Sequence, residues 1–140
     1  MPIMEKDIQK DVEGWLKKRC QEVRVQVSIG DKYFELQEKK DLDVVGITAR
    51  GKTYIVECKP GSLKRPSQGI GQLLMYKALI ELDFSGFKMD LKTKGFNAKL
   101  INRIDPSKMR YYLALSKEAN KKVLNYMIRE LCHGIKIRYL

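Results

Sequence analysis

The sequence predicts a single α/β domain in which helices cover a β-sheet, with the element order α-β-β-β-α-β-α-β. The chain has 140 residues, of which 44% are hydrophobic, enough for one sizeable core. No linker, repeat or low-complexity segment divides the chain, so residues 1–140 are expected to form one domain. Segments with the two-residue hydrophobic period of strands alternate with segments that have the helical period.

The first half of the chain predicts one helix followed by three strands. Residues 3–20 place apolar side chains at helical spacing, at Ile8, Val12, Trp15 and Leu16. Residues 22–29 alternate strictly, which predicts a strand with one apolar face made of Val23, Val25, Val27 and Ile29. Two β-branched segments, 43–48 and 52–58, follow and predict a hairpin around residues 49–51, closed by Pro60-Gly61.

The second half predicts two further helices and two strands. Pro66 opens a helix over 66–82, whose expected core stripe is Ile70, Leu73, Leu74 and Ala78. Residues 84–108 contain two glycines, a proline and scattered aromatic residues, and we expect them to be irregular and partly mobile. Residues 109–116 predict a strand, the next helix ends at Gly134, and residues 135–140 predict the last strand.

The charge balance points to a polyanionic partner. Twenty-eight Lys and Arg against seventeen Asp and Glu leave a net charge of +11, which attracts nucleic acid first and an anionic membrane surface second. No apolar segment approaches the ~20 residues of a membrane span, and the first residues lack a signal-peptide pattern. We therefore expect a cytoplasmic protein that does not enter a membrane.

Cysteine and histidine usage excludes several kinds of site. Cys20, Cys58 and Cys132 are odd in number and far apart, which argues against a disulfide framework and a cysteine-ligated metal. His133 is the only histidine of the sequence, so no Ser-His-Asp arrangement is expected.

Charged residues at the ends of the predicted hairpin strands form the most informative pattern. Glu57 and Lys59 share one face of their strand, and Cys58 points to the other. A three-residue loop, Ala49-Arg50-Gly51, pairs Asp43 with Glu57, whereas a two-residue loop pairs Asp43 with Cys58. The three-residue loop favours glycine in the left-handed position, so we predict positive φ at Gly51 and two carboxylates side by side.

Two neighbouring carboxylates repel one another unless a cation lies between them. Oxygen ligands with open positions suit Mg²⁺, which retains waters and accepts phosphate oxygens. A lysine beside such a metal can orient or deprotonate a water, or stabilise the charge that develops on phosphorus.

Asp43 followed by Glu57-Cys58-Lys59, after a helix and a strand and before a long helix, resembles the PD-(D/E)xK nuclease superfamily. Gln72 and Tyr76 in the following helix look like the QxxxY element of its RecB-like branch. Glu5 is similar to the acidic residue that many members carry in the first helix. The likeness extends from about residue 3 to residue 139, with Leu42 where the family commonly has proline. It implies a restriction-endonuclease-like three-layer fold with a mixed central sheet flanked by helices.

The resemblance implies a role for each matching residue. Asp43 and Glu57 are expected to ligate Mg²⁺, with Mn²⁺ able to substitute, and the backbone carbonyl of Cys58 to supply a third oxygen. Lys59 is expected to position or activate the attacking water. Glu5 would reach the outer shell of the metal, with Glu13 as an alternative, and Asp41 is a rival ligand. Gln72 and Tyr76 would line the site, since residues four apart share a helix face.

The implied activity is that of a metal-dependent nuclease which hydrolyses DNA phosphodiester bonds through a metal-activated water. The alternative is a non-catalytic nucleic-acid-binding or assembly subunit that keeps the fold. An iron–sulfur cluster is not expected, because it needs four cysteines. A homodimer is compatible with the resemblance, since many such nucleases cut two strands with two subunits. Residues expected to contact nucleic acid are Lys64, Arg65, Gln68, Lys92 and Lys94.

Overall fold

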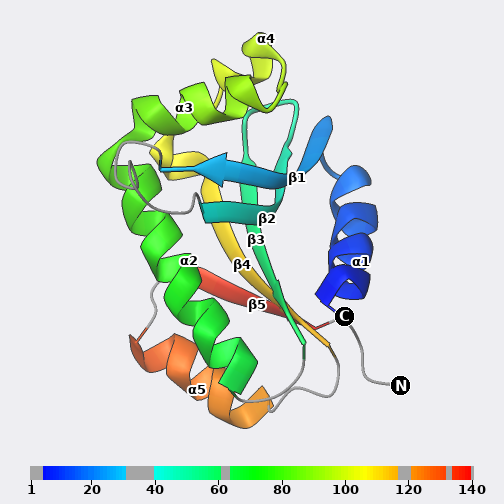
Figure 1. Ribbon diagram of the computed structural model, residues 1–140, viewed down its shortest axis with the longest axis vertical. Helices are drawn as coiled ribbons and strands as arrows, with labels where there is room; N and C mark the ends of the chain where they lie inside the picture. Colours follow the sequence, from blue (N-terminus) through cyan, green and yellow to red (C-terminus); the bar gives the residue numbers. More distant parts are fainter. Residues whose placement is uncertain (1–4, 31–39, 61–63, 117–120, 132–133, 140) are drawn as a thin grey trace.

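A five-stranded mixed sheet forms the centre of the molecule (Figure 1). The computed structural model describes residues 5–30, 40–60, 64–116, 121–131 and 134–139, and only the backbone at residues 40, 64, 65 and 131. The strands lie in the order β1-β2-β3-β4-β5, antiparallel from β1 to β3 and parallel from β3 to β5. Their bounds are Glu22–Ile29, Lys40–Ile47, Thr53–Lys59, Met109–Leu115 and Ile135–Tyr139.

Helices cover both faces of the sheet, so the predicted α/β class is confirmed. On one face α1 (Glu5–Lys17) buries Ile8, Val12 and Leu16 in a cluster with side chains of β2, β3 and β4. The other face is covered by apolar residues of α2 (Lys64–Leu82), α3 (Phe84–Thr93) and α5 (Lys121–Leu131). The central strand β3 is buried along its whole length, as expected where both faces are covered. None of the helices in the described ranges is sufficiently long and apolar to cross a membrane.

The prediction that residues 84–108 are irregular is wrong. The segment contains α3, the short helix α4 (Ala98–Ile101) and a 3₁₀ turn at Pro106–Lys108. The Asp83 side chain caps α3 by accepting a hydrogen bond from the Gly86 N–H at 3.1 Å. Phe87 and Leu91, one turn apart, are buried in the core. The cap and this apolar pair stabilise the helix by more than the glycines destabilise it. The observed element order therefore has α3 and α4 between α2 and β4, where no helix was expected.

The helix over 66–82 is present and begins two residues earlier, but its predicted core stripe is partly wrong. Ile70 and Leu73 are buried as expected, whereas Leu74 is 39% exposed and Ala78 is exposed. Tyr76 and Ile80 are buried instead. The buried face of α2 is thus rotated toward Tyr76, which turns this tyrosine toward the end of the sheet that carries the acidic residues.

The hairpin between β2 and β3 has the predicted three-residue loop. Thr48 accepts a hydrogen bond from the Gly51 N–H, and its own N–H donates to the Lys52 carbonyl at 2.9 Å. Gly51 has φ +91°, and a Cβ there would collide with the backbone carbonyl of Arg103. The register runs from Ile47 opposite Thr53 to Val44 opposite Val56, and one further step puts Asp43 across from Glu57. The sequence-based register is therefore confirmed, although β2 begins three residues before Asp43.

The regular alternation predicted for β1 is interrupted at Gln26. Val23 and Val25 face α1, whereas Val27 and Ile29 lie in the core on the opposite face. Gln26 has φ +51°, the left-handed region, which non-glycine residues rarely adopt. In the ladder with β2, Val25 pairs with Val44 and Val27 with Leu42, and no Gln26–Asp43 pair is formed between them. The prediction of one apolar face is therefore wrong, because the strand changes face at this residue.

We predict opposite effects for two substitutions at Gln26. Gln26→Gly removes the left-handed penalty of about 1 kcal/mol and should leave the free energy of unfolding equal or slightly higher. Gln26→Val should lower it by about 1–3 kcal/mol, because a β-branched residue tolerates positive φ poorly. Urea unfolding of both variants measures the difference. Equal stability of the two variants would show that the backbone is not held in this conformation.

Candidate metal centre and active site

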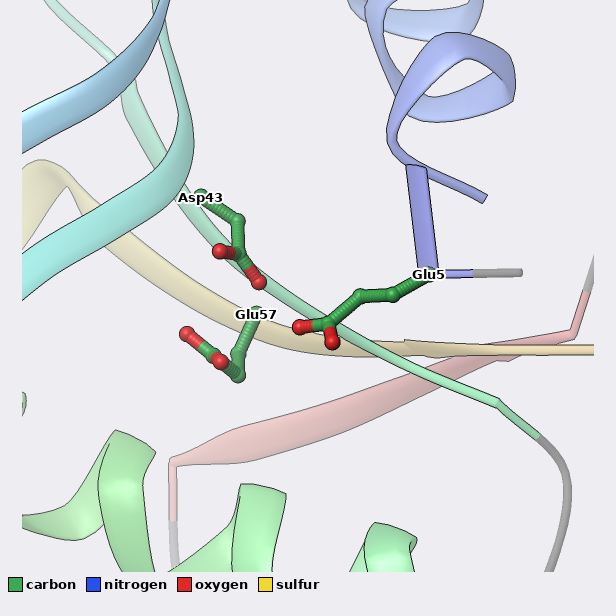
Figure 2. Close-up of side chains that lie close together, drawn as sticks. All are labelled: Glu5, Asp43 and Glu57. Carbon is green, nitrogen blue, oxygen red and sulfur yellow. The ribbon is translucent and has the colours of Figure 1, made fainter. Parts of the chain in front are cut away.

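Three carboxylates from three different elements gather at one end of the sheet (Figure 2). Glu5 is the first residue of α1, Asp43 lies in β2 and Glu57 lies in β3. Each offers a carboxylate oxygen, and these oxygens lie within 4.8 Å of one another. Asp43 and Glu57 are buried, at 8% and 3% exposed, and Glu5 is partly exposed. The three residues are 38 and 14 positions apart in the sequence, so only the fold brings them together.

Asp43 is held in place by the backbone of the central strand. Its Oδ2 accepts a hydrogen bond from the Cys58 N–H at 2.8 Å. This bond forms next to the interruption between β1 and β2, where Asp43 has no ladder partner in β1. Because the N–H and C=O of one strand residue point the same way, the Cys58 carbonyl lies on the Asp43 side of β3. This orientation is compatible with the predicted third oxygen ligand.

The Cys58 side chain lies on the other face of β3, as predicted. It is fully buried in the cluster under α1. Burial raises the pKa of its thiol, and the nearby charges of Asp43 and Glu57 raise it further. A buried thiol that keeps its proton is a packing residue and not a nucleophile.

Lys59 places its ammonium group among the carboxylates. Its Nζ lies 3.4 Å from Glu57 Oε1 and 3.5 Å from Glu5 Oε1. The side chain is buried and passes over Gly69 of α2, where a Cβ would lie 2.9 Å from Lys59 Cγ. Glu57 and Lys59 therefore share a face, as the strand period predicts.

The site is electrostatically unfavourable without a further cation. Burial, followed by the negative charge of Asp43, raises the pKa of Glu57 to about 9, although Lys59 opposes the shift. Burial also raises the pKa of Asp43, against the effect of the Cys58 N–H bond. Three ionised carboxylates and one ammonium carry a net charge of −2, which a divalent cation neutralises.

Two polar residues of α2, Gln72 and Tyr76, were predicted to line the site. The Tyr76 hydroxyl donates to the backbone carbonyl of Asp41 at 3.4 Å. Burial and then the charges of Glu57 and Asp43 raise the pKa of Tyr76, as expected for a phenol beside this acidic group. Gln72 lies one turn before Tyr76, and its Oε1 is buried without a hydrogen-bond partner in the described part of the chain. Tyr76 therefore lies near the carboxylates, and Gln72 lies one turn away on the same face of α2.

Other sequence candidates lie apart from this group. Asp41 is exposed and accepts a hydrogen bond from the Ser28 hydroxyl at 2.5 Å, and Glu13 pairs with Lys17 at 3.8 Å. Of the two alternatives left open by the sequence, the geometry favours Asp43 over Asp41 and Glu5 over Glu13.

The residues predicted to contact nucleic acid are spread over two helices. Gln68 is exposed on α2, while Lys92 near the end of α3 and Lys94 just after it are exposed near α4, away from the first turn of α1 (Figure 1). The side chains of Lys64 and Arg65 lie outside the described part of the structure. The structure therefore does not bring Lys92 and Lys94 to the carboxylates.

Gly69 is a site residue that the sequence reasoning missed. Its missing side chain allows α2 to approach β3 and β4, since a Cβ would lie 2.6 Å from Leu113 Cδ1 as well as close to Lys59. A glycine inside a helix costs about 1 kcal/mol relative to alanine and thereby signals close packing. That signal was present in the segment SQGIGQ, although it did not indicate which of the two glycines makes the contact.

The residues present fit a small divalent cation. The three carboxylates supply hard oxygen ligands, as Mg²⁺ and Mn²⁺ prefer. Glu57 Oε2 is buried and has no hydrogen-bond partner among the described residues, so it is available as a ligand. No thiol or imidazole belongs to the group, which disfavours a structural zinc site.

Comparisons of the chain with protein families, with curated proteins and with solved structures each found no match. The interpretation of the site therefore rests on its own geometry and chemistry.

The raised pKa of Glu57 predicts that the metal-free protein loses stability as the pH rises. Protonated Glu57 favours the folded state, so its contribution is complete below the ordinary value of 4.5 and is lost as the pH rises through about 9. Glu57→Gln cannot ionise and should raise the free energy of unfolding at pH 8.5 in EDTA by about 1–2 kcal/mol. In a domain of this size the melting temperature should increase by about 3–6 °C.

Thermal unfolding between pH 5 and pH 9 in EDTA tests this expectation. Glu13→Gln, which removes a carboxylate of the same kind from the partly exposed Lys17 pair, serves as the control and should leave the pH dependence unchanged. An unchanged pH dependence in Glu57→Gln would contradict the electrostatic description of the site.

Proposed function

We propose that the chain is a metal-dependent nuclease that hydrolyses phosphodiester bonds of DNA. One observation carries the proposal: three carboxylate oxygens within 4.8 Å of one another, with the Lys59 ammonium 3.4–3.5 Å from two of those carboxylates. Metal-dependent hydrolysis of a phosphodiester uses a bound divalent cation, a positioned water and positive charge near the phosphoryl oxygens. The three carboxylates supply ligands for the divalent cation. The Lys59 ammonium can position the water and supply positive charge for the phosphoryl oxygens.

When bound, Mg²⁺ supplies Lewis acidity, which lowers the pKa of a coordinated water and withdraws charge from a phosphoryl oxygen. Asp43 and Glu57 hold it, and Glu5 adds a carboxylate that is partly open to solvent. The Cys58 N–H keeps the Asp43 carboxylate oriented. Fixed ligands of this kind avoid reorganisation during the reaction.

Lys59 is the residue to which we assign the positioning of the attacking water. Its ammonium donates to carboxylates on both sides, and so is held between Glu5 and Glu57. From there it can orient a water by hydrogen bonding and stabilise negative charge on the phosphoryl oxygens. The buried Lys59 stem, packed on Gly69, limits the positions that the ammonium can reach.

The proposal includes a restriction-endonuclease-like fold. It is supported by the mixed sheet, by helices on both of its faces and by the acidic residues on two adjacent strands. The likeness to the PD-(D/E)xK pattern supports the same assignment, because Asp43, Glu57, Lys59 and Tyr76 lie near one another, with Gln72 one turn before Tyr76 on α2. The net charge of +11 supports a polyanionic substrate.

A cleavage assay in Mg²⁺ or Mn²⁺ tests the proposal on single-stranded, duplex, flapped and four-way-junction DNA. We expect Asp43→Asn and Lys59→Ala each to lower the cleavage rate by at least about 100-fold. Asp41→Asn is the matched control, since it is the same substitution two residues earlier in β2, at an exposed position. The cleavage rate of Asp41→Asn should lie within about twofold of the wild-type rate.

An equal loss of cleavage rate in Asp41→Asn and Asp43→Asn would contradict the assignment of Asp43, and not Asp41, as a metal ligand. Cleavage retained in Lys59→Ala would remove the lysine from the reaction. A wild-type protein that binds DNA, cleaves none of the four substrates and takes up no Mn²⁺ would favour the non-catalytic binding subunit instead.

A further inference from the structure

A basic groove lies beside α1, on a part of the molecule separate from the carboxylates. It is an open hollow of about 480 Å³ in which four basic side chains surround an indole ring and one acidic residue. We use the name basic groove for the surface formed by Lys10, Asp11, Gly14, Trp15, Lys18, Arg19 and Arg138.

The position of the groove follows from how α1 covers the sheet. The α1 contacts are mainly with β1, β2 and β3, and β5 is the edge strand beyond them. Along β5 the apolar side chains of Ile135, Ile137 and Tyr139 pack toward α2 and α5. Lys136 and Arg138 alternate with them and are exposed on the α1 face of the sheet. This face of the edge strand is therefore left open and is lined by cations.

Trp15 fixes two guanidinium groups in the basic groove. The Arg138 and Arg19 guanidinium carbons lie 4.6 Å and 5.2 Å from the centre of the indole ring. The ring itself packs edge-on against Tyr54 and Tyr112, with centroids 5.9 Å and 5.4 Å away. A guanidinium stacked on a fixed ring loses little freedom on binding. Arg19 Nη1 donates to the Trp15 carbonyl at 3.1 Å, which also holds this group in place, and the remaining N–H groups can donate to phosphate oxygens.

The side chains that line the basic groove carry an excess of positive charge. Within the described ranges, Lys10, Lys18, Arg19 and Arg138 form no ion pair with a carboxylate. Four cations face a single acidic residue, Asp11, so the local charge is +3. No protruding apolar side chain accompanies them, since Trp15 is only partly exposed and is packed on two tyrosines. This composition suits a phosphate backbone better than a lipid surface, which would also take up apolar groups.

The basic groove lies apart from the carboxylates along α1, and most of its α1 residues project away from Glu5. Gly14 comes nine residues after Glu5, which corresponds to about 180° of rotation around the helix. Trp15 lies ten residues after Glu5, which corresponds to about 15 Å along the helix axis. A ligand in the groove therefore does not occupy the carboxylate site.

We propose that the basic groove binds the phosphodiester backbone of a nucleic acid, independently of the carboxylate site and without a metal ion. Sequence reasoning assigned nucleic-acid contacts to α2 and to the segment after it, and none to this face. In the groove, guanidinium groups fixed on Trp15 and the lysines of α1 donate to phosphate oxygens. The proposal holds whether or not the chain cleaves DNA.

Fluorescence anisotropy with a labelled 20-base-pair duplex in EDTA tests this proposal, because cleavage cannot contribute there. Gly14→Glu adds a carboxylate to the groove without a clash, since no atom lies within 4 Å of a Cβ at this position. Arg138→Gln removes one stacked guanidinium group. Each substitution should weaken binding about three- to tenfold and lower the slope of log K against log salt by about 1.

Ala78→Glu is the matched control, because it makes the same change in net charge at an exposed position of α2. Its dissociation constant for the duplex should lie within about twofold of the wild-type value. An equal loss in Ala78→Glu, or no loss in either groove variant, would overturn the proposal. Binding to phosphatidylserine vesicles that is lost in the groove variants while duplex binding is unchanged would assign the groove to a membrane surface instead.

Circular dichroism shows whether each variant is folded. The double variant Lys10→Gln/Lys18→Gln changes only exposed side chains, and it provides a second test if Arg138→Gln is destabilised. It should lower the salt slope by about 2, and an unchanged slope in this folded variant would also overturn the proposal.

Discussion

The hydrogen bond from the Cys58 backbone N–H to the Asp43 carboxylate connects the architecture of the sheet with the chemistry of the site. It forms where pairing between β1 and β2 is interrupted at Gln26, so that a side chain takes the place of regular pairing. The central strand β3 is buried, and the carboxylate bound to it is therefore buried as well. Desolvation and the neighbouring Asp43 charge then leave Glu57 protonated until the pH approaches about 9. Ionising Glu57 without a further positive charge lowers the stability of the folded state, and this is the physical reason to expect a cation there.

Negative and positive charges are concentrated in different parts of the molecule. The carboxylate group is locally acidic, whereas the whole chain carries +11 and therefore attracts polyanions. A phosphodiester substrate is repelled by free carboxylates, so its binding has to rely on cations outside them. Lys59 is the ammonium within the group, and the basic groove beside α1 offers cations apart from it. Under the two proposals, substitutions in the basic groove alter binding, whereas substitutions at Asp43, Glu57 or Lys59 alter the chemistry.

The sequence predicted features that depend on local chemistry and missed those that depend on packing between distant segments. Gly51 was identified because a three-residue hairpin loop needs positive φ, and this loop set the register that places Asp43 across from Glu57. The change of face at Gln26 was missed, because strict alternation of valines predicts a regular strand. The helix at Phe84–Thr93 was missed as well, since its stability comes from the Asp83 cap and from burial of Phe87 against the core. Glu5 could be singled out only by family resemblance, and the geometry then placed it within reach of the other carboxylates.

We propose that Glu5, Asp43 and Glu57 together hold a divalent cation. Anomalous diffraction from a crystal grown with Mn²⁺ above pH 8 tests it directly, because manganese scatters anomalously and the ligands are identified by position. We expect a strong anomalous peak enclosed by these three carboxylates, with Lys59 beside it, and no such peak in crystals of Asp43→Asn. A wild-type crystal without a peak at this position, in which the carboxylates are ordered and contact only Lys59, would contradict it.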